Sequence, residues 1–346
     1  MIQFYDIIIE MFSIGNRRFV GSKQKLADWI IEAINTNCKG SSFFEVFAGT
    51  SVVSFMLATQ MKRLVINDTL QANNVIYEAF YGKGKKSQKK LNDYKERFNC
   101  ISRSKIKKAW FTKNYGGKYF GKKDCSVIES IRNLLEKEKS KITKKEYNIL
   151  LASLIYSMDK IANTVGHFDA FIQEKPDDNL FFFDLIQPLD LQGVKVEIYC
   201  RDANDLAKKV KTDIAYIDPP YNSRQYCQFY HIYETLVKWD NPEIFGTALK
   251  RKGEALSDYC RTAAPVVFGD LVKNLHCNYL VISYNNTYNS KSNSSRNKIQ
   301  LNEITNILSK YGEVKRISRK HKAFNTGKTD LPNHKEFLFI LKKRLK

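Results

Sequence analysis

The stretch FFEVFAGTSVVSFMLATQMKRLVINDTLQANNVIYEAF, residues 43–80, decides the fold of this 346-residue chain. Its apolar runs at residues 43–47 and 64–66 predict buried strands, and residues 51–60 and 70–80 predict helices. Strands that alternate with helices favour a parallel sheet with crossover helices. The alternation resumes later, with strands expected at residues 196–199, 214–217, 279–283 and 337–341 and helices at residues 229–239 and 301–310. Apolar residues at helical spacing predict one more helix at residues 22–35.

The segment between these two halves has a different character. Residues 81–190 carry charge runs, aromatic residues and only patchy helical periodicity. A structureless loop of that length is uncommon inside a compact domain. We therefore expect a mostly helical second domain at residues 81–190, inserted into an α/β domain made of residues 12–80 and 191–346.

The positive charge of the chain is concentrated in the same segment. The net charge is +21, and residues 81–146 hold 21 Lys and Arg against 7 Asp and Glu, a net +14. Aromatic residues are interleaved with these charges. A basic, aromatic-rich stretch is typical of a nucleic-acid surface. A solvated, lysine-rich helical insert is the alternative.

Composition excludes several classes of protein. No apolar run approaches the roughly 18 residues of a membrane span. Residues 1–10 lack a basic region typical of a signal peptide, and Met11 is an alternative start. The seven cysteines are scattered, which favours reduced thiols and a cytoplasmic protein. The five histidines show no paired spacing, so no metal site is expected.

A rigid polar corner follows the expected strand at residues 214–217. Asp218, Pro219, Pro220 and Tyr221 place a carboxylate, two prolines and an aromatic ring at the end of that strand. Such a corner suits a flat aromatic amine that is held by its edge and its face. The tetrapeptide resembles the catalytic motif of amino-methyltransferases, which methylate the exocyclic amine of adenine or cytosine. No Pro-Cys dipeptide occurs, so the nucleophile that methylation of cytosine carbon 5 requires is missing.

A glycine marks the turn from the first expected strand into its helix. Glycine there lets backbone N–H groups approach a ligand closely. Residues 45–51 resemble the Phe-x-Gly-x-Gly motif that cradles the amino-acid part of S-adenosylmethionine in these methyltransferases, although Ser51 replaces the usual second glycine. The resemblance implies that the cofactor contacts lie at Phe47, Ala48, Gly49, Thr50 and Ser51.

Other cofactor contacts are expected outside this turn. Asp68 ends the second strand, where an acid can accept both ribose hydroxyls of a nucleoside; a solvated acid is the alternative. Residues 18–23 resemble the segment before the Phe-x-Gly motif in Dam and FokI-type adenine methyltransferases. That resemblance implies contacts from Phe19, Gly21 and Lys23, with Lys23 facing the cofactor carboxylate. It also implies that Asp202 lies beside the cofactor adenine.

The order of these motifs is that of the Dam-like group, and residues 222–235 look specifically like the FokI-type enzymes. The resemblance implies a Rossmann-like methyltransferase sheet with helices on both faces, interrupted by a mostly helical target-recognition domain. It also implies a site-specific DNA methyltransferase that uses S-adenosylmethionine to methylate adenine N6.

The chemistry of the amine assigns roles to the polar corner. The lone pair of adenine N6 is delocalised into the ring, so two acceptors aimed at its hydrogens would make that pair available. We assign these acceptors to the Asp218 carboxylate, which would also face the cofactor, and the Pro219 carbonyl, with Pro220 stiffening the corner. Tyr221 would stack on a base that has left the duplex.

The expected partner is double-stranded DNA, and a restriction endonuclease that cuts the same site is a second candidate partner. Two alternatives stay open. The first is the same chemistry on cytosine N4 or on RNA, although Asp at position 218 favours adenine by resemblance. The second is a DNA-binding or cofactor-binding module without activity.

Overall fold

The computed structural model describes residues 12–104, 106, 109–287, 296–321 and 333–344. Met11, the alternative start, lies outside the described residues. The strands of the main sheet are Ser42–Glu45 (β1), Arg63–Asn67 (β2), Lys195–Tyr199 (β3), Ile214–Ile217 (β4), Tyr279–Asn285 (β7), Gly312–Lys320 (β8) and Lys335–Lys343 (β9).

Within the described residues these strands form one sheet in the order β3–β2–β1–β4–β7–β9–β8. The first five strands in this order are parallel to one another, and β9 runs antiparallel to both β7 and β8. Strand β1 pairs with β2 on one side and β4 on the other, so the strand order reverses at β1. Ligands of open α/β sheets bind at such a reversal, outside the carboxyl ends of the strands.

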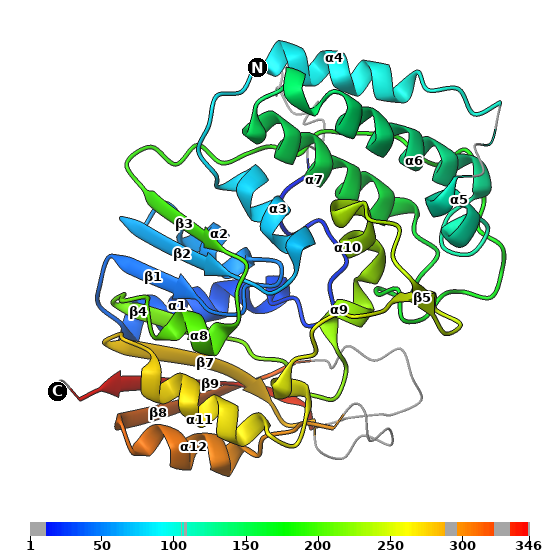
Figure 1. Cartoon of the computed structure of the whole chain (residues 1–346). Helices are drawn as coiled ribbons and strands as arrows, with labels where there is room; N and C mark the ends of the chain where they lie inside the picture. Colours follow the sequence, from blue (N-terminus) through cyan, green and yellow to red (C-terminus); the bar gives the residue numbers. More distant parts are fainter. Residues whose placement is uncertain (1–11, 105, 107–108, 288–295, 322–332, 345–346) are drawn as a thin grey trace, which may run out of the picture.

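Helices cover both faces of the sheet, which confirms the predicted α/β class. One face packs against Ala27–Asn37 (α1) and Val52–Leu57 (α2), and the other against Ala203–Ala207 (α8), Ala264–Asn274 (α11) and Leu301–Ser309 (α12). Figure 1 shows α11 and α12 in front of the sheet. The alternation of side chains along β1 explains the two layers, since Phe43 packs with α1 and Phe44 with α11.

Helices are the main regular structure of residues 81–161, and residues 162–190 hold no helix. The α-helices are Gln88–Asn99 (α4), Trp110–Tyr115 (α5), Lys122–Lys137 (α6) and Lys144–Ile161 (α7). They gather beside Gln71–Phe80 (α3) and His231–Lys238 (α10), which belong to the sheet half of the chain (Figure 1). One buried cluster runs through α3, α6, α7 and α10 without a break. The segment therefore shares a core with the sheet half, and its role as a target-recognition domain stays a prediction.

Two basic residues of this segment are buried caps rather than surface charges. The Lys145 ammonium donates to the carbonyls of Glu78 and Ala79 at the end of α3, at 3.0 and 2.8 Å. The Arg132 guanidinium donates to the carbonyls of Leu236 and Val237 at the end of α10, at 2.6 and 3.2 Å. Cations stabilise helix carboxyl ends because they satisfy the last carbonyls and the helix dipole. The segment thus caps the carboxyl ends of two helices that belong to the sheet half of the chain.

The aromatic residues of the basic stretch correct one expectation. Seven of the eight aromatic residues at positions 81–146 are buried, and only Trp110 is partly exposed; the buried residues are Tyr81, Tyr94, Phe98, Phe111, Tyr115, Tyr119 and Phe120. Aromatic and charged residues alternate along the sequence, but in a folded helix they lie on different faces. Aromatic residues at helical spacing lie on the face that packs against the core, whereas most of the charged residues lie on the solvent face. Any nucleic-acid surface on this segment therefore consists of Lys and Arg side chains rather than of these rings.

The shared core leads to a prediction about unfolding. Leu154 of α7 is fully buried in the cluster that includes α3 and α10. We expect Leu154→Ala to lower the free energy of unfolding by about 2–5 kcal/mol and to shift one cooperative transition. Denaturant unfolding followed by circular dichroism and tryptophan fluorescence measures this. The control is Val266→Ala, because Val266 is 74% exposed. Two separate transitions would show that residues 81–190 fold as an independent domain.

A short hairpin follows α10. It pairs Ile244–Phe245 (β5) with Lys250–Arg251 (β6), and Tyr226–Phe229 (α9) precedes α10. Among the described residues no helix is both long and apolar enough to cross a membrane.

Candidate cofactor and base pocket

A cavity of about 360 Å³ opens at the carboxyl ends of the parallel strands, where the strand order reverses. Three predicted cofactor residues line it from the loop before α1: Phe19, Gly21 and Lys23. Four more predicted cofactor residues line the cavity from the turn after β1: Phe47, Ala48, Gly49 and Thr50. Three acids line it from the ends of β2, β3 and β4, and these are Asp68, Asp202 and Asp218. The fold thus brings together ten of the eleven positions that the sequence assigns to the cofactor.

The turn after β1 is held by its own hydrogen bonds. Gly49 has φ +53°, and its N–H donates to Asp68 Oδ2 at 2.9 Å. Its carbonyl accepts from the Tyr77 hydroxyl at 2.7 Å. A Cβ atom at Gly49 would lie 3.1 Å from the Phe19 ring, in addition to the backbone strain. The glycine is therefore needed for both the conformation and the close approach of Phe19.

Ser51 lies apart from the other ten positions. It is fully buried at the start of α2 and does not line the cavity. Its φ of +58° is the left-handed conformation that a glycine adopts without cost. The Tyr81 hydroxyl donates to the Ser51 carbonyl at 2.9 Å, and the Ser51 hydroxyl donates to Glu45 Oε2 at 3.2 Å. These contacts explain how the turn keeps its shape without the second glycine.

Asp68 and Asp202 anchor backbone as well as facing the cavity. Asp68 accepts from the N–H groups of Gly49 and Leu70, one on each oxygen. Burial raises the pKa of Asp68, while these N–H groups and Arg17 act in the opposite direction. Asp202 caps α8 through Oδ1, which accepts from Asn204 and Asp205. A carboxylate has about four acceptor positions, so each acid keeps capacity for a ligand.

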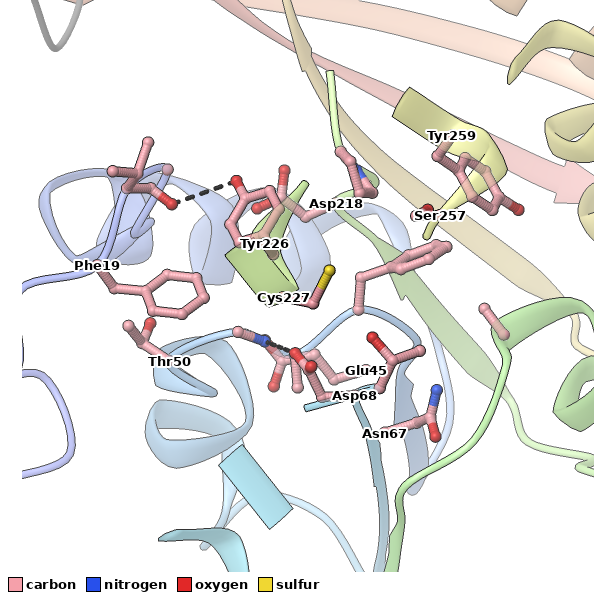
Figure 2. A pocket seen from close by; sticks show the side chains of 18 of the residues that line it. Phe19, Glu45, Thr50, Asn67, Asp68, Asp218, Tyr226, Cys227, Ser257 and Tyr259 are labelled. Carbon is pink, nitrogen blue, oxygen red and sulfur yellow. Dashed lines mark hydrogen bonds between the residues drawn. The ribbon is translucent and has the colours of Figure 1, made fainter. Parts of the chain in front are cut away.

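Two tyrosines that follow the corner at residues 218–221 fasten the loop at residues 18–23. The Val20 N–H donates to the Tyr230 hydroxyl at 2.7 Å. The Tyr226 hydroxyl donates to the Val20 carbonyl at 3.3 Å (Figure 2). The Phe19 and Tyr230 rings stack with centroids 4.4 Å apart. These contacts fix the loop at residues 18–23 to the chain that follows the corner at residues 218–221.

Asp218 is already engaged in the free protein. Its Oδ2 lies 3.0 Å from the Lys23 ammonium, and the Tyr221 hydroxyl donates to its Oδ1. Burial raises the pKa of Asp218, although Lys23 and Tyr221 both oppose that rise. Burial alone would lower the pKa of Lys23, but Asp218 and Glu336 raise it. The structure pairs Lys23 with Asp218, and its predicted contact with a cofactor carboxylate stays a prediction.

The rest of the corner divides between the cavity and the core. Pro220 lines the cavity, whereas Pro219 and Tyr221 do not. The Tyr221 ring packs against Tyr284 of β7, with centroids 4.6 Å apart. Its predicted stacking on a flipped base therefore stays a prediction.

Glu45 is a buried acid at the base of the cavity, near Asp218, Tyr77 and Tyr81. Its Oε2 accepts from the Ser54 N–H at 3.1 Å. Burial raises the pKa of Glu45 from 4.5 to about 8, despite the hydrogen bonds from Ser54 and Ser51. The folded protein therefore holds this proton more tightly than the unfolded chain does.

This shift predicts a pH dependence of stability. Below pH 4.5 the raised pKa of Glu45 leaves the free energy of unfolding unchanged, because the carboxyl group is protonated in both states. As the pH rises from 4.5 to about 8, the free energy of unfolding falls, because the carboxyl group is ionised in the unfolded chain but still protonated in the folded protein. Above about pH 8 Glu45 is ionised in both states, and the loss stays constant. We expect the free energy of unfolding of Glu45→Gln, relative to wild type, to rise between pH 5 and pH 8. Urea unfolding of both proteins at several pH values measures the difference. A difference that does not change with pH would contradict the assignment.

Several residues in or behind the pocket were assigned no role from the sequence. Tyr259 contacts Phe47 edge to face, with centroids 4.9 Å apart, and both line the cavity. Gln225 and Ser257 exchange two hydrogen bonds, from Gln225 Nε2 to the Ser257 carbonyl and from the Ser257 N–H to Gln225 Oε1. Buried Arg17 donates to the Gly49 carbonyl at 3.4 Å and to Asn73 at 2.7 Å.

Figure 2 shows Asn67 and Asp68 on one side of the cavity, and Asp218 and Tyr226 on the other. The sheet order and a polar, aromatic pocket at the strand reversal are typical of Rossmann-like folds, whose ligands bind at this place. The family model for D12 class N6 adenine-specific DNA methyltransferases matches residues 19–264. The chain therefore belongs to the D12 class of N6 adenine-specific DNA methyltransferases.

Individual relatives agree with this assignment. The type II methyltransferase M.NlaIII of Neisseria lactamica is 29% identical over 349 residues, which cover 94% of this chain and 99% of that protein. The type II methyltransferase M.CviAII of Paramecium bursaria Chlorella virus 1 is 29% identical, with 93% and 97% covered. The type II methyltransferase M.FokI of Planomicrobium okeanokoites is 30% identical over 94% of this chain but only 52% of its own length.

Proposed function

We propose that this protein transfers a methyl group from S-adenosylmethionine to the N6 amine of adenine in duplex DNA, as the modification enzyme of a restriction-modification system. The observation that carries the proposal is the position of Asp218. This acid ends β4 and opens on the same cavity as the Gly49 turn and Asp68. A carboxylate for the amine and a pocket for a nucleoside therefore meet at the strand reversal.

The residues of the cavity fit S-adenosylmethionine. The volume of about 360 Å³ lies within the range of about 300–1,000 Å³ typical of small-ligand pockets. Asp68 would accept the ribose hydroxyls, and Phe47 and Tyr259 would pack on the adenine near Asp202. The Gly49 turn, Phe19 and Lys23 would hold the amino-acid part. When bound, the cofactor supplies a methyl group on a sulfonium, which is a good leaving group without a metal.

The catalytic corner would act on the amine of the target base. Hydrogen bonds from the two N6 hydrogens to the Asp218 carboxylate and the Pro219 carbonyl would turn the nitrogen lone pair towards the methyl group. This is fixed electrostatic stabilisation together with alignment of the reacting atoms. With the cofactor bound, the nitrogen pair would form the new N–C bond, the C–S pair would stay on sulfur, and one N6 proton would pass to water.

The base must leave the duplex to reach Asp218, at a cost of a few kcal/mol. Tyr221 would stack on it. Exposed lysines of residues 81–146, such as Lys83, Lys85 and Lys86, can offset that cost through phosphate contacts. We propose that residues 81–190 contribute to target recognition. The predicted nuclease partner would be an endonuclease that cuts the same site in unmethylated DNA.

The test is transfer of labelled methyl from S-adenosylmethionine to unmethylated duplex DNA, followed by digestion to nucleosides. We expect label in N6-methyladenosine. Label in N4-methylcytidine would keep the mechanism and change the base. If a parallel reaction with RNA gave label in RNA while the DNA stayed unlabelled, the substrate would be RNA rather than DNA. Cofactor binding without transfer to any nucleic acid would identify a binding module and overturn the proposal.

A further inference from the structure

Glu336 is a buried acid, within electrostatic range of Lys23 and Asp218, that the sequence does not single out. It lies on β9, opposite Asn285 of β7, and is 6% exposed. Asn285 Nδ2 approaches Glu336 Oε1 only at 3.5 Å. Glu336 Oε2 is buried and has no hydrogen-bond partner among the described residues. A buried acceptor without a partner costs about 1–3 kcal/mol, so such an atom needs an explanation.

The charged side chains that act on Glu336 are Lys23 and Asp218. Lys23 opposes the effect of burial, which raises the pKa of Glu336 to about 7, and Asp218 adds to that rise. Both acids in turn raise the pKa of Lys23. Tyr216 and Tyr221 lie in the same cluster, where both acids raise their pKa. The Lys23 ammonium therefore acts electrostatically on both buried carboxylates, but among the described residues it forms an ion pair only with Asp218.

This pairing opposes the role proposed for Asp218. The carboxylate must attract an N6 hydrogen, but Lys23 holds one of its oxygens at 3.0 Å and Tyr221 donates to the other. An ammonium on the carboxylate weakens its attraction for a second donor, since the two positive hydrogens repel each other. Asp218 would be a stronger acceptor after Lys23 had moved to another anion.

We propose that Glu336 is a positioning residue that takes the Lys23 ammonium when the target amine reaches Asp218. The lysine stem has four flexible carbons, so the ammonium can change partner while its backbone stays in place. Glu336 Oε2 gains the partner that it lacks, and the Asp218 oxygen that Lys23 leaves accepts the amine hydrogen. The net charge of the cluster does not change. This inference rests on the function proposed above.

Glu336→Gln tests the proposal, because glutamine keeps the shape and removes the charge. In single-turnover methyl transfer to duplex DNA we expect a rate about 10- to 100-fold lower, as for other residues that orient a reacting group. The cofactor Kd and the KM for DNA should stay within about threefold of wild type, as expected when only the transition state loses an interaction. The control is Glu197→Gln, whose carboxylate on β3 pairs with Arg63 at 2.9 Å and is expected to leave the rate unchanged.

A double-mutant cycle with Lys23→Met tests whether Glu336 acts through Lys23. If it does, the double variant should transfer methyl no more slowly than Lys23→Met alone. If instead the rate of the double variant fell by the product of the two single-variant decreases, the two residues would act independently and the proposal would be overturned. Thermal unfolding separates a structural role, because Glu336→Gln should not lower the Tm at pH 8. Should Glu336→Gln fail to fold, Glu336→Asp takes its place, with partial activity expected. An inactive wild type would reject the proposed function, whereas an active wild type with an unaffected Glu336→Gln would reject this inference alone.

Discussion

Replacing Asp218 by alanine is expected to lower kcat for adenine methylation by at least about 100-fold, the scale seen when a fixed polar group is removed from a transition state. The variant lacks the carboxylate that would attract an N6 hydrogen. Lys23 keeps its contact with the Gly21 carbonyl at 3.1 Å, so the loop that lines the cofactor pocket retains one anchor. The measurement is labelled methyl transfer at saturating cofactor and DNA.

Two comparisons make this result specific. Asp28→Ala removes an exposed acid from the first turn of α1 and should leave kcat unchanged. The cofactor Kd of Asp218→Ala, measured by equilibrium titration, should stay within about tenfold of wild type. A variant that kept more than a tenth of wild-type kcat would remove Asp218 from the catalytic role.

Replacing Asp68 by alanine should act on cofactor binding rather than on the chemical step. Two hydrogen bonds from ribose hydroxyls to a carboxylate contribute about 1.5–3 kcal/mol each. We therefore expect the cofactor Kd to rise by about 100-fold or more. The variant also leaves the Gly49 N–H without its 2.9 Å acceptor, which loosens the turn. At saturating cofactor, kcat should recover to within about tenfold of wild type.

Asp68→Asn provides the intermediate case, since its amide oxygen can still accept one hydrogen bond. Its Kd should lie between those of wild type and Asp68→Ala. If both variants bound the cofactor as wild type does, Asp68 would serve only to hold the Gly49 turn and the start of α3. Their melting temperatures would then be the quantity that changes.

The sequence predicted the parts of the sheet that are apolar and buried. Strand β4 was expected at residues 214–217 and is found there, because four consecutive buried residues give a clear signal. Strand β8 was missed, since most of its nine residues are exposed and several are charged. Helix α11 was also missed. The bounds of α1 and α2 differ from prediction by a few residues, because capping and turn geometry set helix ends.

Sequence motifs identified the predicted cofactor positions at strand ends, because consecutive residues line the pocket there and a short sequence pattern is enough to recognise them. Glu336 and Tyr259 have no such pattern, and Tyr230, although it lies in the stretch that resembles the FokI-type enzymes, was assigned no contact with the site. They reach the site through the pairing of β9 with β7, a packing contact with Phe47 and a hydrogen bond to Val20. Each is a contact between residues far apart in the chain, which one sequence does not reveal.

The position of β9 has a consequence for synthesis of the protein. Strand β8 is made before β9, but it joins the sheet through β9. During elongation β7 therefore keeps an open edge, and β8 has no place in the sheet, until residues 335–343 have left the ribosome. Open strand edges are templates for pairing with other chains. The edge of β7 stays open to such pairing in that interval, and the strand that ends it also brings Glu336 within electrostatic range of Lys23 and Asp218.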